Sequence, residues 1–151
     1  MKKTVKDSYT EQVQILNQSH MNGFERLFGG TLMQWIDVVA AVVARRHSEK
    51  NVTTVLVDRL EFKKAARAND TLLLTGFITY AGTTSMEVCV NSYVEALNGT
   101  KTLINTAYLV MVALDENDKP AKVPELKLES PEEKRRYEEA LLRRELRKKL
   151  S

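Results

Sequence analysis

Several residue types that build specialised sites are scarce in this chain. It has one cysteine, two histidines and three prolines. The single cysteine, Cys89, excludes an intramolecular disulfide bond, and no spacing of cysteine and histidine predicts a zinc site. No histidine is paired with a serine or cysteine in a pattern that indicates a hydrolase triad. We therefore expect neither a disulfide scaffold, nor a metal centre, nor triad chemistry.

Long hydrophobic runs are absent as well. The N-terminal residues lack the apolar core of a signal peptide, and no apolar run approaches the length of a membrane span. The sequence also contains no internal repeat and no low-complexity segment. We expect a cytoplasmic protein without a membrane partner.

What is present is the composition of an ordinary globular protein, with 43% hydrophobic and 28% charged residues in a chain of 151. The net charge of +3 arises in the C-terminal tail, because residues 130–151 carry eight Lys or Arg and five Asp or Glu, so the other residues balance. This local basicity does not indicate a nucleic-acid-binding domain. We expect one core domain over residues 1–125, followed by a linker and charged helix over residues 126–151.

The organising stretch of the sequence runs from Leu27 to His47. Its apolar residues recur at steps of three and four, as on one face of a helix of about five turns, and they are Leu32, Trp35, Ile36, Val39, Val42 and Val43. Gly29 and Gly30 stand at its start, where a helix has amide N–H groups without partners and favours negative charge. The pattern predicts a buried helix whose N-terminus can receive an anion or a polarised carbonyl.

Asp37 is the only acidic residue in this run, between Ile36 and Val38. Burying a carboxylate without a partner costs several kcal/mol. We therefore expect either a functional role or a partner at a subunit interface.

Strand patterns occupy most of the remaining sequence. They cover residues 13–18, 52–62, 71–80, 85–97 and 102–114, and Asn98-Gly99 is a strong hairpin signal between the last two. Residues 1–8 read as loose and polar, residues 19–26 as a loop, and residues 115–128 as a linker. One helix and mainly hairpin-linked strands predict an α+β fold, an antiparallel sheet curled around a central helix.

The final helix is expected over residues 130–149, with Ser130 as its N-cap and Pro131 in its first turn. It is charged nearly all round, with a narrow apolar stripe of Tyr137, Leu141 and Leu142. Two interpretations stay open. The helix either lies on the domain as a solvated element, or its arginines face phosphates.

Three motifs carry a family resemblance. The segment Asn22-Gly23-Phe24-Glu25-Arg26-Leu27-Phe28-Gly29-Gly30 continues through Leu32-Met33-Gln34-Trp35-Ile36-Asp37, and Val57-Asp58-Arg59-Leu60-Glu61-Phe62 and Gly82-Thr83-Thr84-Ser85-Met86-Glu87-Val88 follow downstream. In place and spacing they resemble the hotdog-fold acyl-CoA thioesterases of the cytosolic acyl-CoA hydrolase type. The similarity spans about residues 10–114 and implies a five-stranded hotdog sheet.

The resemblance implies that Asn22 and Asp37 act on the thioester. A carboxylate can activate water or attack the thioester carbon, a carboxamide can orient that water, and amides at Gly29 and Gly30 can hold the oxyanion. Asp37 lies seven residues beyond Gly30, about 10 Å along a helix, so one carbonyl cannot touch both. We expect a site shared by two protomers of a homo-oligomer, with a dimer as the minimal unit and, by resemblance, a trimer of dimers.

The substrate of such an enzyme is an acyl-CoA, and no cofactor is expected because coenzyme A belongs to the substrate and product. Its phosphates need cations or N–H groups and its pantetheine and acyl chain need an apolar slot. The candidate binding residues are Arg59, Phe62, Lys63, Lys64, Thr83, Thr84 and Ser85, with Arg135 or Arg136 in the tail as further cations.

Other interpretations of these residues remain. Asn22 is also a common turn residue beside Gly23, and the two glycines can serve close packing alone. At the level of function, a non-catalytic acyl-CoA sensor on the same fold is the first alternative. A nucleic-acid-binding role of the basic tail is a more distant one, and a hydratase is disfavoured for lack of a histidine paired with an acidic residue at these positions.

Overall fold

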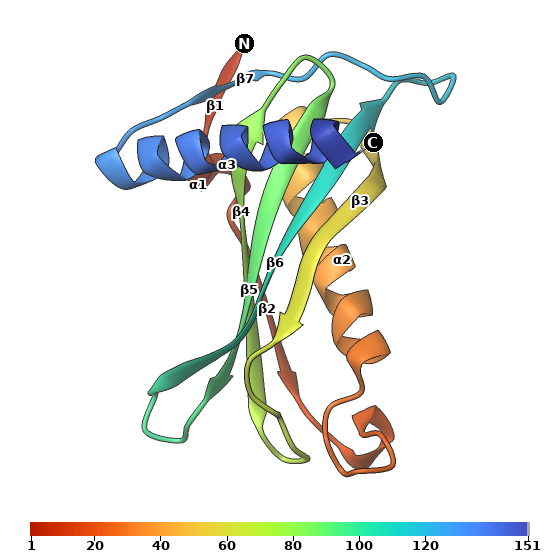
Figure 1. The fold of residues 1–151 in the computed structure, drawn as a ribbon, viewed down its shortest axis with the longest axis vertical. Helices are drawn as coiled ribbons and strands as arrows, with labels where there is room; N and C mark the ends of the chain where they lie inside the picture. Colours follow the sequence, from red (N-terminus) through yellow and green to blue (C-terminus); the bar gives the residue numbers. More distant parts are fainter. Residues whose placement is uncertain (151) are drawn as a thin grey trace.

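The protein is a five-stranded antiparallel sheet with one long helix on each face, as the computed structural model of residues 1–150 shows (Figure 1). The strand order is β2-β4-β5-β6-β3, so β2 and β3 form the two edges. The elements are β1 (Lys2–Thr4), α1 (Val5–Ser8), β2 (Thr10–Ile15), the 3₁₀ turn η1 (Gln18–His20), α2 (Gly29–Ser48), β3 (Asn51–Phe62), β4 (Thr71–Ala81), β5 (Ser85–Glu95), β6 (Lys101–Leu114), β7 (Glu125–Lys127) and α3 (Pro131–Leu150). The predicted α+β architecture is confirmed.

Helix α2 lies in the concave face of the sheet and supplies the core. Leu32, Ile36 and Val43 are fully buried there against apolar residues of β4, β5 and β6. Gly76 on β4 lets the helix approach closely, because a Cβ at this position would lie 2.6 Å from Cγ1 of Val39. None of the helices within residues 1–150 combines the length and the apolar character of a membrane span.

The β5–β6 hairpin forms where Asn98-Gly99 predicts it. Gly99 has a φ of +89° and its amide donates to the carbonyl of Ala96, while the Asn98 side chain accepts from the amide of Thr100. The first strand of the sheet lies earlier than expected, at Thr10–Ile15. Leu16 is a buried core residue that follows this strand.

The N-terminal segment is ordered, contrary to the prediction of a loose polar tail. Strand β1 pairs in parallel with β7, a short strand inside the segment expected to be only a linker. Thr4 and Asp7 cap α1 reciprocally. The Lys3 ammonium group donates to the carbonyl of Arg46 at the end of α2. His47, fully buried in that last turn, lies 2.8 Å from the Pro124 carbonyl, so the segment before β7 is fixed to the end of α2.

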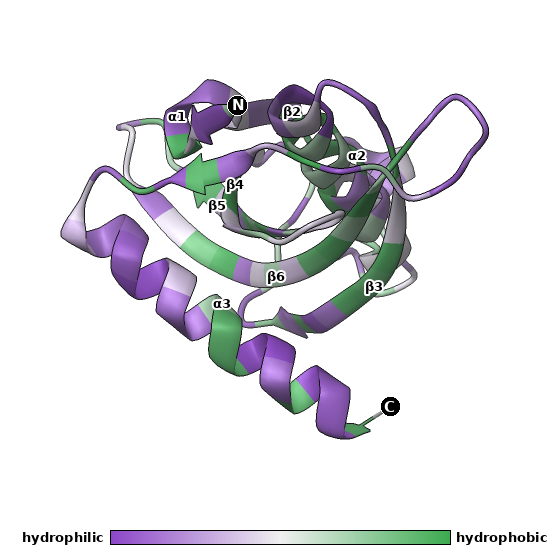
Figure 2. Ribbon diagram, turned by 90° about the horizontal axis from the view of Figure 1, so that it is seen from above, coloured by the Kyte–Doolittle hydropathy of each residue, from purple (hydrophilic) through white to green (hydrophobic). Residues whose placement is uncertain are grey.

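Helix α3 lies across the convex face of the sheet (Figure 2). The predicted apolar stripe faces the protein only in part: Tyr137 packs against Tyr80 of β4 with ring centroids 5.3 Å apart, whereas Leu142 is 67% exposed. Ala140 is the only buried residue of the described part of α3. Arg143 and Arg147 point to the sheet instead. Both bind Glu87 of β5, which is 2% exposed, so charged groups hold the C-terminal half of the helix in addition to the Tyr137 contact.

Candidate active site

The loop before α2 is shaped by Asn22. Its side-chain carbonyl accepts hydrogen bonds from the amides of Phe24 at 2.8 Å and Arg26 at 3.2 Å. The side-chain oxygen of Asn22 therefore has the turn-forming role that the sequence suggested. The carboxamide NH₂ group donates to none of the described residues, so it is available to a ligand.

The N-terminus of α2 offers two backbone donors. The helix begins at Gly29 after Phe28, which provides no side-chain cap. The amides of Thr31 and Leu32 donate to the carbonyl of Phe28, whereas those of Gly29 and Gly30 have no acceptor within residues 1–150. A Cβ on Gly30 would lie 2.7 Å from Cε2 of Phe28, so glycine is also needed for space there.

A cavity of about 400 Å³ opens beside these donors. It contains four kinds of group that a bound thioester would need: a carboxamide, a backbone amide, an apolar wall and cations. Phe62 forms part of the apolar wall, because a Cβ on Gly29 would contact its ring at 3.5 Å. The lining residues are Asn22, Arg26, Leu27, Gly29, Phe62, Lys63, Lys64, Ala65, Ala66 and Ile104.

Asp37 lies outside this cavity and is only half-buried in the single chain, which corrects the expectation of a buried carboxylate. Its Oδ1 accepts a hydrogen bond of 2.7 Å from the Thr54 hydroxyl on β3. Two turns of α2 separate it from Gly30, about 10 Å along the helix axis. Within one chain, therefore, the carboxylate and the amide donors form two separate groups.

The remaining candidate residues do not line this cavity. Arg59 has an exposed side chain at a bulge of β3, where its φ is 60°. Thr83, Thr84 and Ser85 lie at the β4–β5 turn, at the opposite end of β4 from the loop that contains Asn22 (Figure 1). The eleven residues of β4 put on the order of 30 Å between these two ends. A single chain does not bring the 83–85 turn to the cavity.

The two histidines have structural partners. His20 accepts a hydrogen bond from the amide of Asn17 and packs edge-on against Trp35, with ring centroids 5.0 Å apart. His47 lies at the other end of α2, where burial lowers the pKa of its imidazole. Neither forms a pair with a serine or cysteine nucleophile within residues 1–150.

Thr54 is the site residue that sequence reasoning missed. It stands among other Thr and Val residues of a strand, and nothing in that local pattern separates it from its neighbours. Its link to Asp37 spans 17 residues and exists only once β3 lies beside α2. The buried charges around Glu87 were missed for a similar reason, since a lone glutamate inside a strand does not reveal its partners on a distant helix.

Comparison with known proteins shows which family has this sequence and fold. The thioesterase superfamily model matches residues 24–97. An acyl-CoA hydrolase from Staphylococcus aureus, solved with butyryl coenzyme A, coenzyme A and coenzyme A disulfide, superposes with a TM-score of 0.93 and 35% identity over 98% of this chain and 91% of its own. A hexameric acyl-CoA thioesterase solved without ligand gives a TM-score of 0.94 and 40% identity, covering 98% of this chain and 96% of that chain.

Among curated relatives, the uncharacterised acyl-CoA thioester hydrolase YkhA of Bacillus subtilis is 40% identical over 113 residues, which are 74% of this chain and 66% of YkhA. The match to mouse acyl-coenzyme A thioesterase 11 covers only 23% of that longer protein. Further structures of the S. aureus hydrolase are of variants in which one asparagine, one aspartate or one threonine is replaced by alanine. By sequence and by structure, the chain belongs to the hotdog-fold acyl-CoA thioester hydrolases of the thioesterase superfamily.

Proposed function

We propose that this protein hydrolyses acyl-CoA thioesters to the free acid and coenzyme A, at a site shared between two protomers. The observation that carries the proposal is the separation of Asp37 from the amide donors on one helix. The alanine variants of the S. aureus hydrolase support the choice of Asn22, Asp37 and Thr54 as site residues. The asparagine, aspartate and threonine replaced in that protein are separated by fifteen and seventeen positions, and the same two intervals separate Asn22, Asp37 and Thr54.

Strand β3 provides the surface for the second protomer. It is an edge of the sheet and exposes Val55, Leu56 and Leu60, which favours pairing with another strand. If two β3 edges pair antiparallel about residue 58, residue 54 of one chain stands opposite residue 62 of the other. This register brings Asp37 of the partner subunit towards the cavity that Phe62 lines.

The residues then divide the chemistry. The amides of Gly29 and Gly30 hold the oxyanion that develops on the thioester carbonyl, and the NH₂ group of Asn22 orients the attacking water or the carbonyl. Asp37 of the partner subunit takes a proton from water as it adds to the carbonyl, or attacks the carbon directly and forms an anhydride, which water then hydrolyses to the free acid and the regenerated carboxylate. Thr54 holds this carboxylate in place. The carbon–sulfur bond breaks, and the coenzyme A thiolate takes up a proton.

Substrate binding is assigned to both protomers. Phe62 forms part of the apolar wall, and Lys63 and Lys64 line the cavity with positive charge for the phosphates. Arg59, exposed on the bulge of β3, is proposed as a further cation outside the cavity. The turn with Thr83, Thr84 and Ser85 would reach the same mouth from the partner subunit, because antiparallel pairing of β3 brings opposite ends of the two sheets together. Water, a carboxylate and amide donors suffice for this reaction, so no cofactor is proposed.

Assembly beyond the dimer is proposed from the neighbours. The 40% identical thioesterase is hexameric, which favours a trimer of dimers here. The proposed location is the cytoplasm, where acyl-CoA is available. Neither a membrane nor a nucleic acid has a role in this mechanism.

The shared site is tested by mixing two inactive chains. Asn22→Ala and Asp37→Ala should each reduce thiol release from acyl-CoA by at least about 100-fold, because each removes a group that acts in the transition state. Random pairing gives half mixed dimers with one intact site each, so the mixture should regain about a quarter of the wild-type activity. No recovery, with subunit exchange verified by chains of different tag length, would reject the shared site.

A further inference from the structure

Helix α3 carries three of its four leucines on the side away from the sheet. Leu142, Leu146 and Leu150 are 67%, 59% and 89% exposed and recur every four residues, so they share one helix face. Arg143 and Arg147 occupy the face that contacts the sheet. A surface helix of a single domain has the reverse pattern. The outward leucines therefore indicate a second apolar contact for α3.

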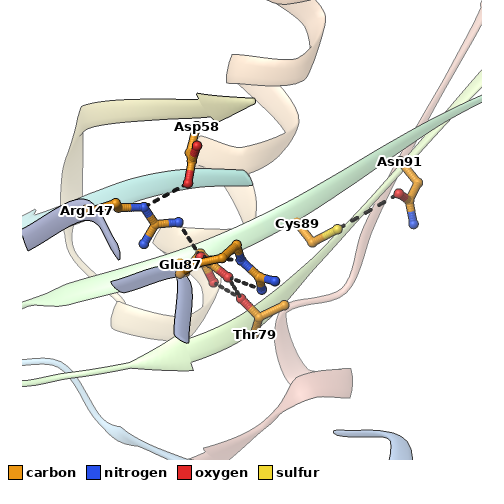
Figure 3. A network of polar contacts seen from close by, with 7 residues as sticks. Asp58, Thr79, Glu87, Cys89, Asn91 and Arg147 are labelled. Atoms are coloured by element: carbon orange, nitrogen blue, oxygen red, sulfur yellow. Dashed lines mark hydrogen bonds and ion pairs between the residues drawn. The ribbon is translucent and has the colours of Figure 1, made fainter. Parts of the chain in front are cut away.

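The buried charges determine where α3 ends. Figure 3 shows Arg147 between two carboxylates: it donates to Glu87 of β5 and, through Nε at 3.1 Å, to Asp58 of β3. Arg143 holds both oxygens of Glu87, at 3.0 and 2.7 Å. This bidentate pair fixes both the position and the direction of the helix. The last turn of α3 thus lies over residue 58 of the edge strand, and in Figure 2 its end extends outwards past the sheet.

Residue 58 is also the midpoint of the proposed antiparallel pairing between the β3 strands of two copies. In an antiparallel pair whose residues 54 and 62 stand opposite each other, the two-fold axis passes beside residue 58. This step rests on the proposed function, which requires Asp37 of one copy at the cavity of the other. Only three described residues follow Arg147, so α3 ends about 4.5 Å farther along its axis.

We propose that the last turn of α3, with Leu146 and Leu150, packs against the same turn of a second copy. The two turns would meet across the seam, which is the line along which the β3 strands of the two copies pair. Paired strands lie about 5 Å apart, whereas packed helices need 8–10 Å between their axes. Two helices that each end over the seam therefore meet, and their outward leucines become buried. The partner is a second copy of this chain, because the α3 contact lies beside the paired β3 edges. The two-fold axis that relates the two β3 strands also relates the two α3 ends.

Cross-linking tests this contact without reference to activity. Leu146→Cys and Leu97→Cys each place a thiol at an exposed leucine, the second on the β5–β6 hairpin away from the seam. Cys89 is buried and gives no background. With a short bis-maleimide, we expect the Leu146→Cys chain to form a covalent dimer at least tenfold faster than the Leu97→Cys chain. Equal rates would overturn the α3 contact.

Subunit exchange provides a second measurement. Leu146→Gln together with Leu150→Gln should speed exchange between Asn22→Ala and Asp37→Ala chains about tenfold or more, while the final recovered activity stays the same. Unchanged exchange would reject the contact but leave the shared site intact. Failure of the parent chains to recover activity would reject the shared site, while the cross-linking result would still decide whether the α3 ends meet.

Discussion

Helices α2 and α3 have the same length of 20 residues and lie on opposite faces of one sheet, but different forces hold them. Helix α2 buries a continuous apolar face, including Leu32, Ile36 and Val43. Helix α3 buries only Ala140 among its described residues and packs Tyr137 against Tyr80, and Arg143 and Arg147 bind a glutamate inside the sheet. Apolar contacts are non-directional, whereas a bidentate arginine pair fixes an orientation. Helix α2 therefore forms the core, and the ion pairs of α3 fix its direction on the sheet.

The largest effect is expected in the α2 layer. Ile36→Ala removes a fully buried side chain and should lower the free energy of unfolding by about 2–5 kcal/mol. Leu142→Ala on α3 removes a side chain that is mostly exposed in the single chain and should change it by less than about 0.5 kcal/mol. Urea unfolding of both variants measures the contrast. Equal losses would show that the two layers do not differ in this way.

The charged layer should be the next most sensitive. Glu87→Ala leaves two partly buried arginines without their main acceptor and should cost about 3 kcal/mol. Replacing the group with Glu87→Leu, Arg143→Met and Arg147→Met should restore most of that stability, because apolar residues of similar volume avoid the desolvation of the charges. Thermal unfolding compares the variants. If the triple variant is as unstable as Glu87→Ala, the loss does not come from unpaired charge.

The two layers should lose stability in different pH ranges when the protein is acidified. Burial lowers the pKa of His47 below 6.5, so the unfolded chain takes up its proton first and stability falls as the pH drops below 6.5. Hydrogen bonds from Arg143, Thr79 and Arg147 lower the pKa of Glu87 below 4.5 although burial opposes them, so its contribution is lost only below pH 4.5. Unfolding between pH 7 and 3 should show both windows. His47→Gln should abolish the first alone.

The smallest effect is expected at the exposed charges of α3. Arg135 contacts Glu132 and Glu139 at the surface, where water screens such pairs. Arg135→Ala should change stability by less than about 0.5 kcal/mol, and Arg143→Ala by several times more. Chemical denaturation of the two variants gives the comparison. A similar loss in both would contradict the special role of the buried arginine.

The same contrast explains what the sequence predicts. Apolar periodicity and turn residues are local features, so they indicate α2, the succession of strands along the chain and the hairpin at Asn98-Gly99. The order of the strands in the sheet appears only in the structure. The pairing of β1 with β7 joins residues more than 120 positions apart, and no local pattern of either segment indicates it. The orientation of α3 depends on Glu87, whose partners lie 56 and 60 positions away.

For the site, the motif match selects Asn22, Gly29 and Phe62, which the structure brings to one cavity, and their roles stay predictions. The bond from Thr54 to Asp37 appears only in the fold. The exposure of Asp37 also depends on tertiary context, because its neighbours along α2 are apolar but the helix rotates it towards β3. Sequence patterns thus indicate candidate reacting groups, whereas the hydrogen bond that orients Asp37 appears only in the fold.

The proposed product is itself a thiol, and the protein carries one sulfhydryl group of its own. Burial raises the pKa of Cys89 to about 12, so its thiolate is scarce at neutral pH and hidden from solvent. Exchange with oxidised coenzyme A would need that thiolate in contact with the disulfide. If the proposed reaction takes place, enclosure of Cys89 between the sheet and α3 prevents the protein from forming a mixed disulfide with its own thiol product.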